Sequence, residues 1–188
     1  GTADMTGAPT RRTILKGGIV LMTGLASATG CSGTQPEATP PALERHVREH
    51  YVVYTNLDYA APAGRGHLLD VYLPRETSEP APVVVFQMGS AFGSDDTKGN
   101  ALADGDGETV LDPVSAGGMI DAPQLAAKLV SHGYAVVGIN VRSSSQVKFP
   151  GQVHDVKAAI RFLRANATAL GLDPDRFATM GNSSGAWG

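Results

Sequence analysis

Three apolar strand patterns separated by two amphipathic helix patterns constrain this chain more than any other feature of its sequence. Residues 83–86 form a short, continuously apolar run, and residues 134–141 form a second run rich in valine. Runs of this kind are typical of strands that are covered on both faces of a sheet, and the first should be central. The third strand is expected at residues 177–180, after a turn at residues 172–175.

The two segments between these strands have the signals of helices. Asp121 is a suitable N-cap, Pro123 falls in the first turn, and Gly133 stops the first helix. Residues 152–165 predict the second helix, because they place one apolar stripe opposite a basic face. The stripe comprises Val153, Val156, Ile160 and Leu163. Alternating strands and helices predict an α/β fold in which crossover helices join parallel strands.

Two further strand patterns precede this arrangement. Residues 50–57 and 67–73 alternate apolar and polar side chains of strand-favouring types, and residues 62–66 would close a hairpin between them. Residues 93–118 are rich in Asp and Gly and show the least pattern. A loop of more than about 15 residues is usually either functional or mobile.

The N-terminal segment has the pattern of an export signal followed by a tether. Arg11 and Arg12 precede an uncharged stretch, residues 17–30, as in a twin-arginine signal peptide. That stretch is too short and too weakly apolar to span a bilayer. It ends in small residues before Cys31 and so resembles the lipobox of bacterial lipoproteins, in which the cysteine is lipidated. The alternative is an ordinary thiol beside a plain cleavage site.

We expect the signal at residues 1–31, a Pro- and Thr-rich tether at residues 32–41 and the folded domain at residues 42–188.

Composition excludes several classes of function. The chain has 188 residues, of which 42% are hydrophobic and 18% charged, and its formal net charge of -3 offers no basic surface for nucleic acid. A single cysteine excludes an intrachain disulfide and a zinc site built on several thiolates. The acidic run at residues 104–108 lacks the spacing of an EF-hand loop and is interpreted as a solvated loop. We expect neither a metal ion nor an organic cofactor.

The motif with the clearest chemistry follows the last predicted strand. Residues 181–185 have the pattern Gly-x-Ser-x-Gly, with Ser183 at its centre. In a nucleophile elbow of this pattern the serine lies on a strained turn from a strand to a helix, and the glycines avoid collisions with neighbouring backbone. Ser183 is therefore the predicted nucleophile, at the carboxyl edge of the sheet. The alternative is a plain Gly/Ser turn.

Residues 149–164 and 171–176 are very similar to strings that precede the elbow in α/β-hydrolases. From about residue 54 to residue 188 the chain resembles the front half of that superfamily. It resembles specifically the carboxylesterase branch, which includes hormone-sensitive-lipase-like and feruloyl-esterase-like enzymes. The resemblance implies a three-layer α/β-hydrolase sandwich with a mostly parallel sheet, here truncated after the nucleophile strand.

The same resemblance assigns an oxyanion hole. The branch usually carries His-Gly-Gly-x-Trp after its third strand, and residues 88–92 (Met-Gly-Ser-Ala-Phe) stand in its place. Backbone amides donate to the oxyanion in such a hole, so these replacements of side chains do not by themselves abolish it. The resemblance implies that the amides of Ser90, Ala91 and Ser184 are the donors. The alternative is a Gly/Ser turn after a strand.

The partners of a catalytic serine are not found in this sequence. In α/β-hydrolases an acid and then a histidine follow the serine, but only five residues follow Ser183, and none of them is acidic or histidine. A serine without a base is a poor nucleophile.

The histidines that precede Ser183 are His46, His50, His67, His132 and His154. His154 and Asp155 fall in the first turn of a predicted helix, where the helix dipole explains the carboxylate. We expect the chain to be a truncated copy of a longer enzyme, inactive by itself.

The sequence thus predicts a serine ester hydrolase exported by the twin-arginine pathway. It would be anchored through a lipid on Cys31 at the outer face of the cytoplasmic membrane, or otherwise secreted. Its substrate would be a small-molecule or polysaccharide ester with a small acyl or aryl group. Two alternatives stay open: a serine peptidase of the prolyl-oligopeptidase kind, which shares the elbow, and a non-catalytic surface lipoprotein that keeps the scaffold as a binding module.

Overall fold

The structure is a computed structural model of the chain, and it describes residues 43–62, 64–101 and 119–187. These residues belong to one unit of the chain, residues 38–188. The predicted export signal, Cys31, the tether and the acidic run at residues 104–108 lie outside the described residues. None of the helices in the described ranges is long and apolar enough to cross a bilayer.

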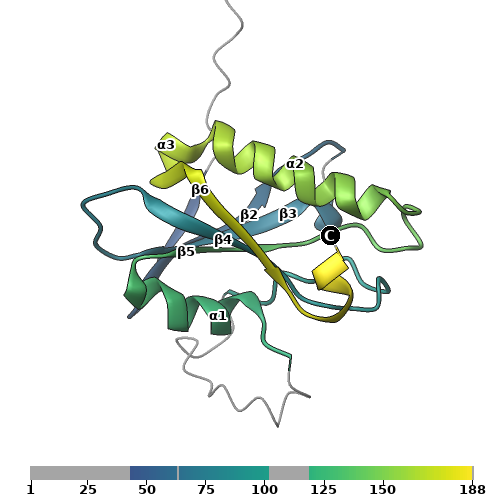
Figure 1. Cartoon of the computed structure of the whole chain (residues 1–188), viewed down its shortest axis with the longest axis horizontal. Coiled ribbons are helices and arrows are strands. Elements are labelled where there is room, and N and C mark those ends of the chain that lie inside the picture. The colour runs from purple at the N-terminus through teal and green to yellow at the C-terminus, as the bar shows by residue number, and fades with distance from the viewer. Residues whose placement is uncertain (1–42, 63, 102–118, 188) are drawn as a thin grey trace, which may run out of the picture. The chain divides into compact units, whose positions relative to one another are not determined.

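A mixed six-stranded sheet forms the middle layer, in the order β1-β2-β3-β5-β4-β6 (Figure 1). The strands are β1 (Glu44–Val47), β2 (Tyr51–Asp58), β3 (Leu68–Pro74), β4 (Ala81–Gln87), β5 (Ala135–Ile139) and β6 (Leu172–Gly181). The pairs β1/β2, β2/β3 and β3/β5 are antiparallel. β4 pairs parallel with β5 on one side and with β6 on the other, so the run at residues 83–86 lies in an interior strand, although β4 is next to the edge strand β6 rather than at the centre of the sheet.

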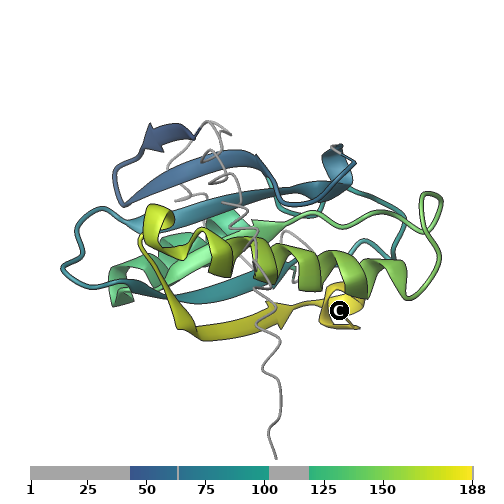
Figure 2. The ribbon, with the colours of Figure 1, turned by 90° about the horizontal axis from the view of Figure 1, so that it is seen from above.

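Helices cover both faces of the sheet, which confirms the predicted three-layer α/β fold. α1 (Ala122–Leu129) and the 3-10 helix η2 (Val130–His132) join β4 to β5, while α2 (Gly151–Ala165) and α3 (Ala167–Leu170) join β5 to β6. β5 and β6 lie on opposite sides of β4, so two crossovers of the same hand place their helices on opposite faces. Figure 1 shows α1 and α2 on these two faces, and Figure 2, seen from above, shows α2 lying over the sheet.

Two clusters of buried apolar side chains hold these layers together. One lies on the α2 side and includes Val83, Val85 and Leu163, and the other lies on the α1 side and includes Phe86 and Leu125. Val85 and Phe86 are neighbours on β4 and therefore point to opposite faces of the sheet. β4 therefore contributes to both cores, which explains its continuously apolar sequence.

Helix α1 begins and ends where the sequence indicates. Asp121 is the N-cap and accepts a hydrogen bond from the backbone amide of Gln124, and Pro123 lies in the first turn. Gly133 ends the 3-10 turn that follows the helix, with a left-handed φ of 82°. On α2, Val156 and Leu163 of the predicted apolar stripe are buried.

The structure contains one strand that the sequence does not predict, β1, and a second strand, β6, whose pairing is interrupted. β1 has three polar residues out of four, so it has no apolar alternation, and it is held by its pairing with β2. In β6, Leu172 pairs with Ala81 and Phe177 pairs with Val83, so residues 173–176 bulge out of the ladder. The turn predicted at residues 172–175 corresponds to this interruption.

Candidate active site

The Gly-x-Ser-x-Gly segment forms a sharp turn between β6 and a 3-10 helix, η3 (Ser183–Trp187). Ser183 has a φ of +49°, a conformation that is uncommon for residues other than glycine, and it is exposed. The Gly185 amide donates to the Asn182 carbonyl oxygen at 2.8 Å and closes the turn. The backbone here has the strained strand-to-helix geometry that the motif requires.

Close backbone packing explains the glycines of the motif. A Cβ atom on Gly181 would overlap the carbonyl oxygen of Gly185, and one on Gly185 would overlap the carbonyl oxygen of Gln87 at the end of β4. A Cβ atom on Gly89 would lie 2.6 Å from the Cβ of Ser183. The elbow therefore packs directly against the loop that follows β4.

That loop carries Ser90 and Ala91, two of the residues assigned to the oxyanion hole. Ala91 and Phe92 have φ values of +50° and +59°. The Ser90 amide donates to Ser184 Oγ at 3.0 Å, and Ser184 is buried. The hydroxyl of Ser184 thus accepts the hydrogen bond of an amide that the family resemblance assigns to the oxyanion hole.

Asn182 is a residue of this site that the sequence analysis did not single out. Its Oδ1 accepts the Gly89 amide at 2.6 Å, and its Nδ2 donates to the carbonyl oxygen of Ile120 at 3.2 Å, just before α1. The side chain ties the elbow to the loop after β4 and to the start of α1. Its only signal in the sequence is its place as the first variable residue of the motif.

The structure brings together four of the five predicted site residues. Ser183 and Ser184 follow β6, while Ser90 and Ala91 follow β4, and these two strands are parallel neighbours. The site therefore lies at the carboxyl ends of parallel strands, where open α/β sheets bind their ligands. Cys31 is the fifth residue and is not in the described ranges.

No histidine is hydrogen-bonded to Ser183 in the part of the chain that the structure describes. His67 is buried, and its Nε2 lies 3.3 Å from Asp155 Oδ1. His46 lies on the edge strand β1, and His154 is exposed on α2.

The structure corrects the interpretation of Asp155. The residue lies beyond the first turn of α2, and its carboxylate is buried rather than exposed to the helix dipole. It accepts hydrogen bonds from the Arg142 backbone amide at 3.1 Å and from Arg142 Nη2 at 2.6 Å. This bonding raises the pKa of Arg142. The ion pair has a structural role, since it ties the segment after β5 to α2.

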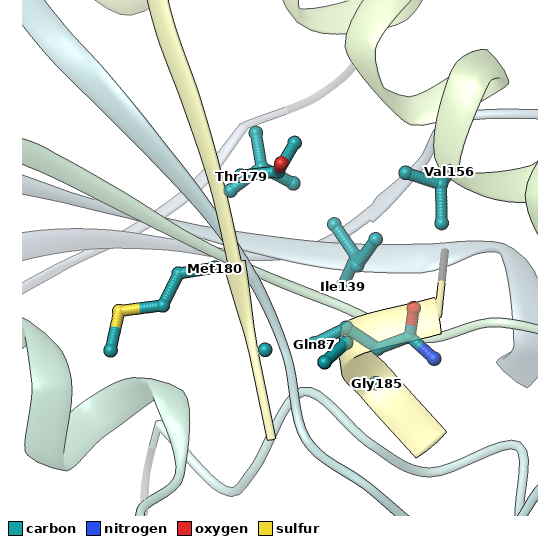
Figure 3. A pocket seen from close by; sticks show the side chains of 9 residues that line it. Gln87, Ile139, Val156, Thr179, Met180 and Gly185 are labelled. Carbon is teal, nitrogen blue, oxygen red and sulfur yellow. The ribbon is translucent and has the colours of Figure 1, made fainter. Parts of the chain in front are cut away.

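Two hollows adjoin the elbow. The first, of about 290 Å³, lies on the α2 side of the sheet (Figure 3). Its walls include Val85, Ile139, Val156 and Thr179. The buried Gln87 also lines it, and among the described residues Gln87 Oε1 has no hydrogen-bond partner. The second hollow, of about 340 Å³, is mostly apolar and is lined in part by Phe92, Phe149 and Trp187.

One buried ion pair involves Lys98, which follows the loop that carries Ser90. Lys98 Nζ donates to Asp70 Oδ2 at 2.7 Å, and both side chains are buried. Burial raises the pKa of Asp70, although Lys98 opposes this effect. Within the described ranges no group of three or more His, Cys, Asp or Glu side chains is placed to hold a metal ion.

Comparisons with known proteins point to ester hydrolases. The model of the BD-FAE family matches residues 69–187. The chain is 26% identical over 151 residues to the esterase LipC of Mycobacterium tuberculosis, a match that covers 80% of this chain and 32% of LipC. The chain thus spans about a third of that relative.

Solved structures agree with this result. A truncated form of a carbohydrate esterase from gut microbiota is 31% identical, with a TM-score of 0.56 over 74% of this chain and 42% of that one. A bifunctional GH43-CE protein of Bacteroides eggerthii is 39% identical, with a TM-score of 0.54 over 71% of this chain and 16% of that one.

Proposed function

The chain belongs to the BD-FAE family of the α/β-hydrolase superfamily, and from this membership we propose that the protein containing it is a serine ester hydrolase that works through an acyl-enzyme. The position of Ser183 carries the proposal. It lies exposed on a turn with positive φ, packed against the loop that holds Ser90 and Ala91. A nucleophile and amide donors this close together can act on one carbonyl group.

In the proposed reaction Ser183 Oγ attacks the ester carbonyl carbon while a histidine takes the hydroxyl proton. The carbonyl oxygen gains the negative charge. When the tetrahedral intermediate collapses, the alcohol leaves with that proton and an acyl-serine ester remains. Water then attacks the acyl group, releases the acid and restores Ser183. Because no described histidine is hydrogen-bonded to Ser183, we assign the base to another part of the protein.

The amides of Ser90, Ala91 and Ser184 are the proposed donors to the oxyanion. The Ser90 amide is bonded to Ser184 Oγ at 3.0 Å, so it must exchange this partner for the substrate oxygen. A rotation of the Ser184 side chain about its Cα–Cβ bond achieves the exchange without moving the backbone. Removing one donor of an oxyanion hole typically costs about 10²–10³ in kcat.

A small acyl or aryl ester, free or on a polysaccharide, is the substrate that we propose. The apolar hollow lined by Phe92 and Phe149 supports an acyl or aryl group beside the elbow. The similarity to a carbohydrate esterase favours a sugar as the alcohol. The proposed reaction uses neither a metal ion nor an organic cofactor.

Export by the twin-arginine pathway and anchoring through a lipid on Cys31 are also part of the proposal. The arginine pair at residues 11–12, the uncharged stretch after it and the small residues before Cys31 support it.

Fluorophosphonate labelling tests the catalytic role of Ser183. In the longest natural protein that contains this chain, an alkyl fluorophosphonate is expected to label Ser183, in the tryptic peptide that begins at Phe177. Ser183→Ala should abolish both labelling and hydrolysis of an aryl acetate. Ser131→Ala is the matched control, because Ser131 is an exposed serine on η2, and it should change neither.

The same experiment separates the alternatives. Cleavage of an anilide in preference to the ester with the same acyl group would identify a serine peptidase. A folded wild-type protein that is not labelled would identify a non-catalytic binding module.

A further inference from the structure

One buried side chain, that of Asn140, holds the far end of the loop that carries Ser90 and Ala91. Asn140 follows β5 and has no exposed surface. Its Oδ1 accepts the backbone amides of Thr97 at 2.6 Å and Lys98 at 2.8 Å. These two bonds fill both acceptor positions of the carboxamide oxygen.

The same carboxamide reaches a third segment. Asn140 Nδ2 donates to the carbonyl oxygen of Arg65 at 2.9 Å, in the connection between β2 and β3. Thr97 is also buried and adds a bond from its hydroxyl to the carbonyl oxygen of Ile139 at 2.9 Å. The end of β5, the loop after β4 and the β2–β3 connection are thereby held in one arrangement.

The bonds of Asn140 to Thr97 and Lys98 hold both ends of the loop, because the two ends are hydrogen-bonded to each other. The Met88 amide donates to the carbonyl oxygen of Thr97 at 3.3 Å, so residues 88–97 form a closed loop whose base rests on Asn140. Within the loop Ala91 has a positive φ. A strained backbone of this kind persists only when its surroundings hold it in place.

The segment that begins at Asn140 also holds the loop further along. The Ser144 amide donates to the carbonyl oxygen of Phe92 at 2.8 Å, and Gln146 Nε2 donates to Asp95 Oδ2 at 2.8 Å. A displacement of Asn140 would therefore move several contacts of the loop together.

We propose that Asn140 is a positioning residue for the oxyanion hole: through Thr97 and Lys98 it sets the place of the Ser90 and Ala91 amides without touching the substrate. The inference rests on the proposed function, in which these amides stabilise the oxyanion. A misplacement of about 1 Å near a reacting group can cost about 10²-fold in rate. Because the donors act mainly on the transition state, the loss falls on kcat and not on KM.

Two substitutions of Asn140 should give graded losses. Asn140→Asp keeps the acceptor positions but cannot donate to the Arg65 carbonyl, whereas Asn140→Ala removes all three bonds. In the longest natural protein that contains this chain, kcat for an aryl acetate should fall about 10-fold and about 100-fold respectively, with KM within about twofold. Asn166→Ala is the matched control, since Asn166 Nδ2 donates to the Phe162 carbonyl oxygen at 2.8 Å, at the end of α2, and kcat should not change.

A milder variant covers the case in which Asn140→Ala does not fold. Thr97→Val keeps the volume of the side chain and removes only the hydroxyl bond to Ile139, so a loss of kcat smaller than that of Asn140→Asp is expected. Unchanged kcat in folded Asn140→Asp and Thr97→Val proteins overturns the inference.

Hydrogen exchange separates positioning from a merely structural role. In Asn140→Ala, the amides of residues 89–93 should exchange faster, together with those of Thr97 and Lys98. Faster exchange at Thr97 and Lys98 alone overturns the inference, because the loop then keeps its place without Asn140.

A wild-type protein that hydrolyses no ester contradicts the proposed function, and the positioning role falls with it. An active wild type with an equally active Asn140→Ala variant contradicts the positioning role alone.

Discussion

Single residues at the elbow are constrained by backbone packing as much as by chemistry. A Cβ atom on Gly185 would overlap the Gln87 carbonyl oxygen, and overpacking of this kind typically costs about 1–3 kcal/mol. We expect Gly185→Ala to lower the free energy of unfolding by that amount in a urea titration. Gly64→Ala is the control, because a Cβ atom there meets nothing within 4 Å and its φ of 165° suits any residue. A change within about 0.5 kcal/mol is expected at Gly64, and equal losses at both glycines would contradict the packing argument.

The buried pair of Asp70 and Lys98 makes a second prediction at this scale. Asp70→Asn leaves the Lys98 ammonium buried without its anion and should cost about 3–5 kcal/mol of unfolding free energy. Adding Lys98→Met to Asp70→Asn should recover much of that loss, because the charge that lacks a partner is gone. Urea titrations of the single and double variants measure this coupling. Asp173→Asn breaks the exposed pair with Arg176 and should leave the free energy of unfolding almost unchanged, because solvent screens such a pair. Additive single losses at Asp70 and Lys98 would show that the pair is not coupled.

At the scale of elements, α1 begins with a capping box. The residue directly before this box, Ile120, accepts a hydrogen bond from Asn182 of the elbow. Asp121 Oδ1 accepts the Gln124 amide at 2.9 Å, and Gln124 Oε1 accepts the Asp121 amide at 3.0 Å. Asp121→Ala should lower the free energy of unfolding by about 1 kcal/mol, because it leaves an amide of the first turn without its partner. Lys128→Ala, on the exposed face of the same helix, should change it by less than about 0.5 kcal/mol. Urea titration measures both, and an unaffected Asp121→Ala protein would show that packing alone holds the helix.

The elements that could be predicted are those whose signals are local. The caps of α1 and the apolar stripe of α2 each lie within one stretch of chain, and the apolar run of β4 indicates that the strand is buried on both faces. β1 could not be predicted, because its sequence has no apolar alternation and only its pairing with β2 holds it as a strand. The bond between His67 and Asp155 joins residues 88 positions apart, and the bond between Asn140 and Thr97 spans 43 positions. Such contacts depend on the topology and leave no periodic signal.

At the scale of the whole molecule, two crossovers bring three functional segments to one edge of the sheet. The loop after β4, Asn140 after β5 and the elbow after β6 all follow the carboxyl ends of neighbouring parallel strands. The elbow and the loop could be foreseen from sequence, because a motif and a resemblance mark them. Neither reveals that the Ser90 amide is bonded to Ser184 Oγ, or that one carboxamide holds the base of the loop. Those details follow from side-chain packing at the edge.

The proposed lipid-anchored export concerns the whole protein, and it implies two separable defects. Replacing Arg11 and Arg12 by lysine should keep the protein in the cytoplasm, because the export machinery reads the arginine pair. Cys31→Ser should permit export but shift the protein from the membrane fraction to the soluble fraction, because lipid chains supply the anchor. Immunoblots of fractionated bacterial cells measure both effects, with Ser32→Ala as the control that keeps the wild-type distribution. A Cys31→Ser protein that stays with the membrane would rule out the lipid as its anchor, while export with both arginines replaced would rule out the twin-arginine route.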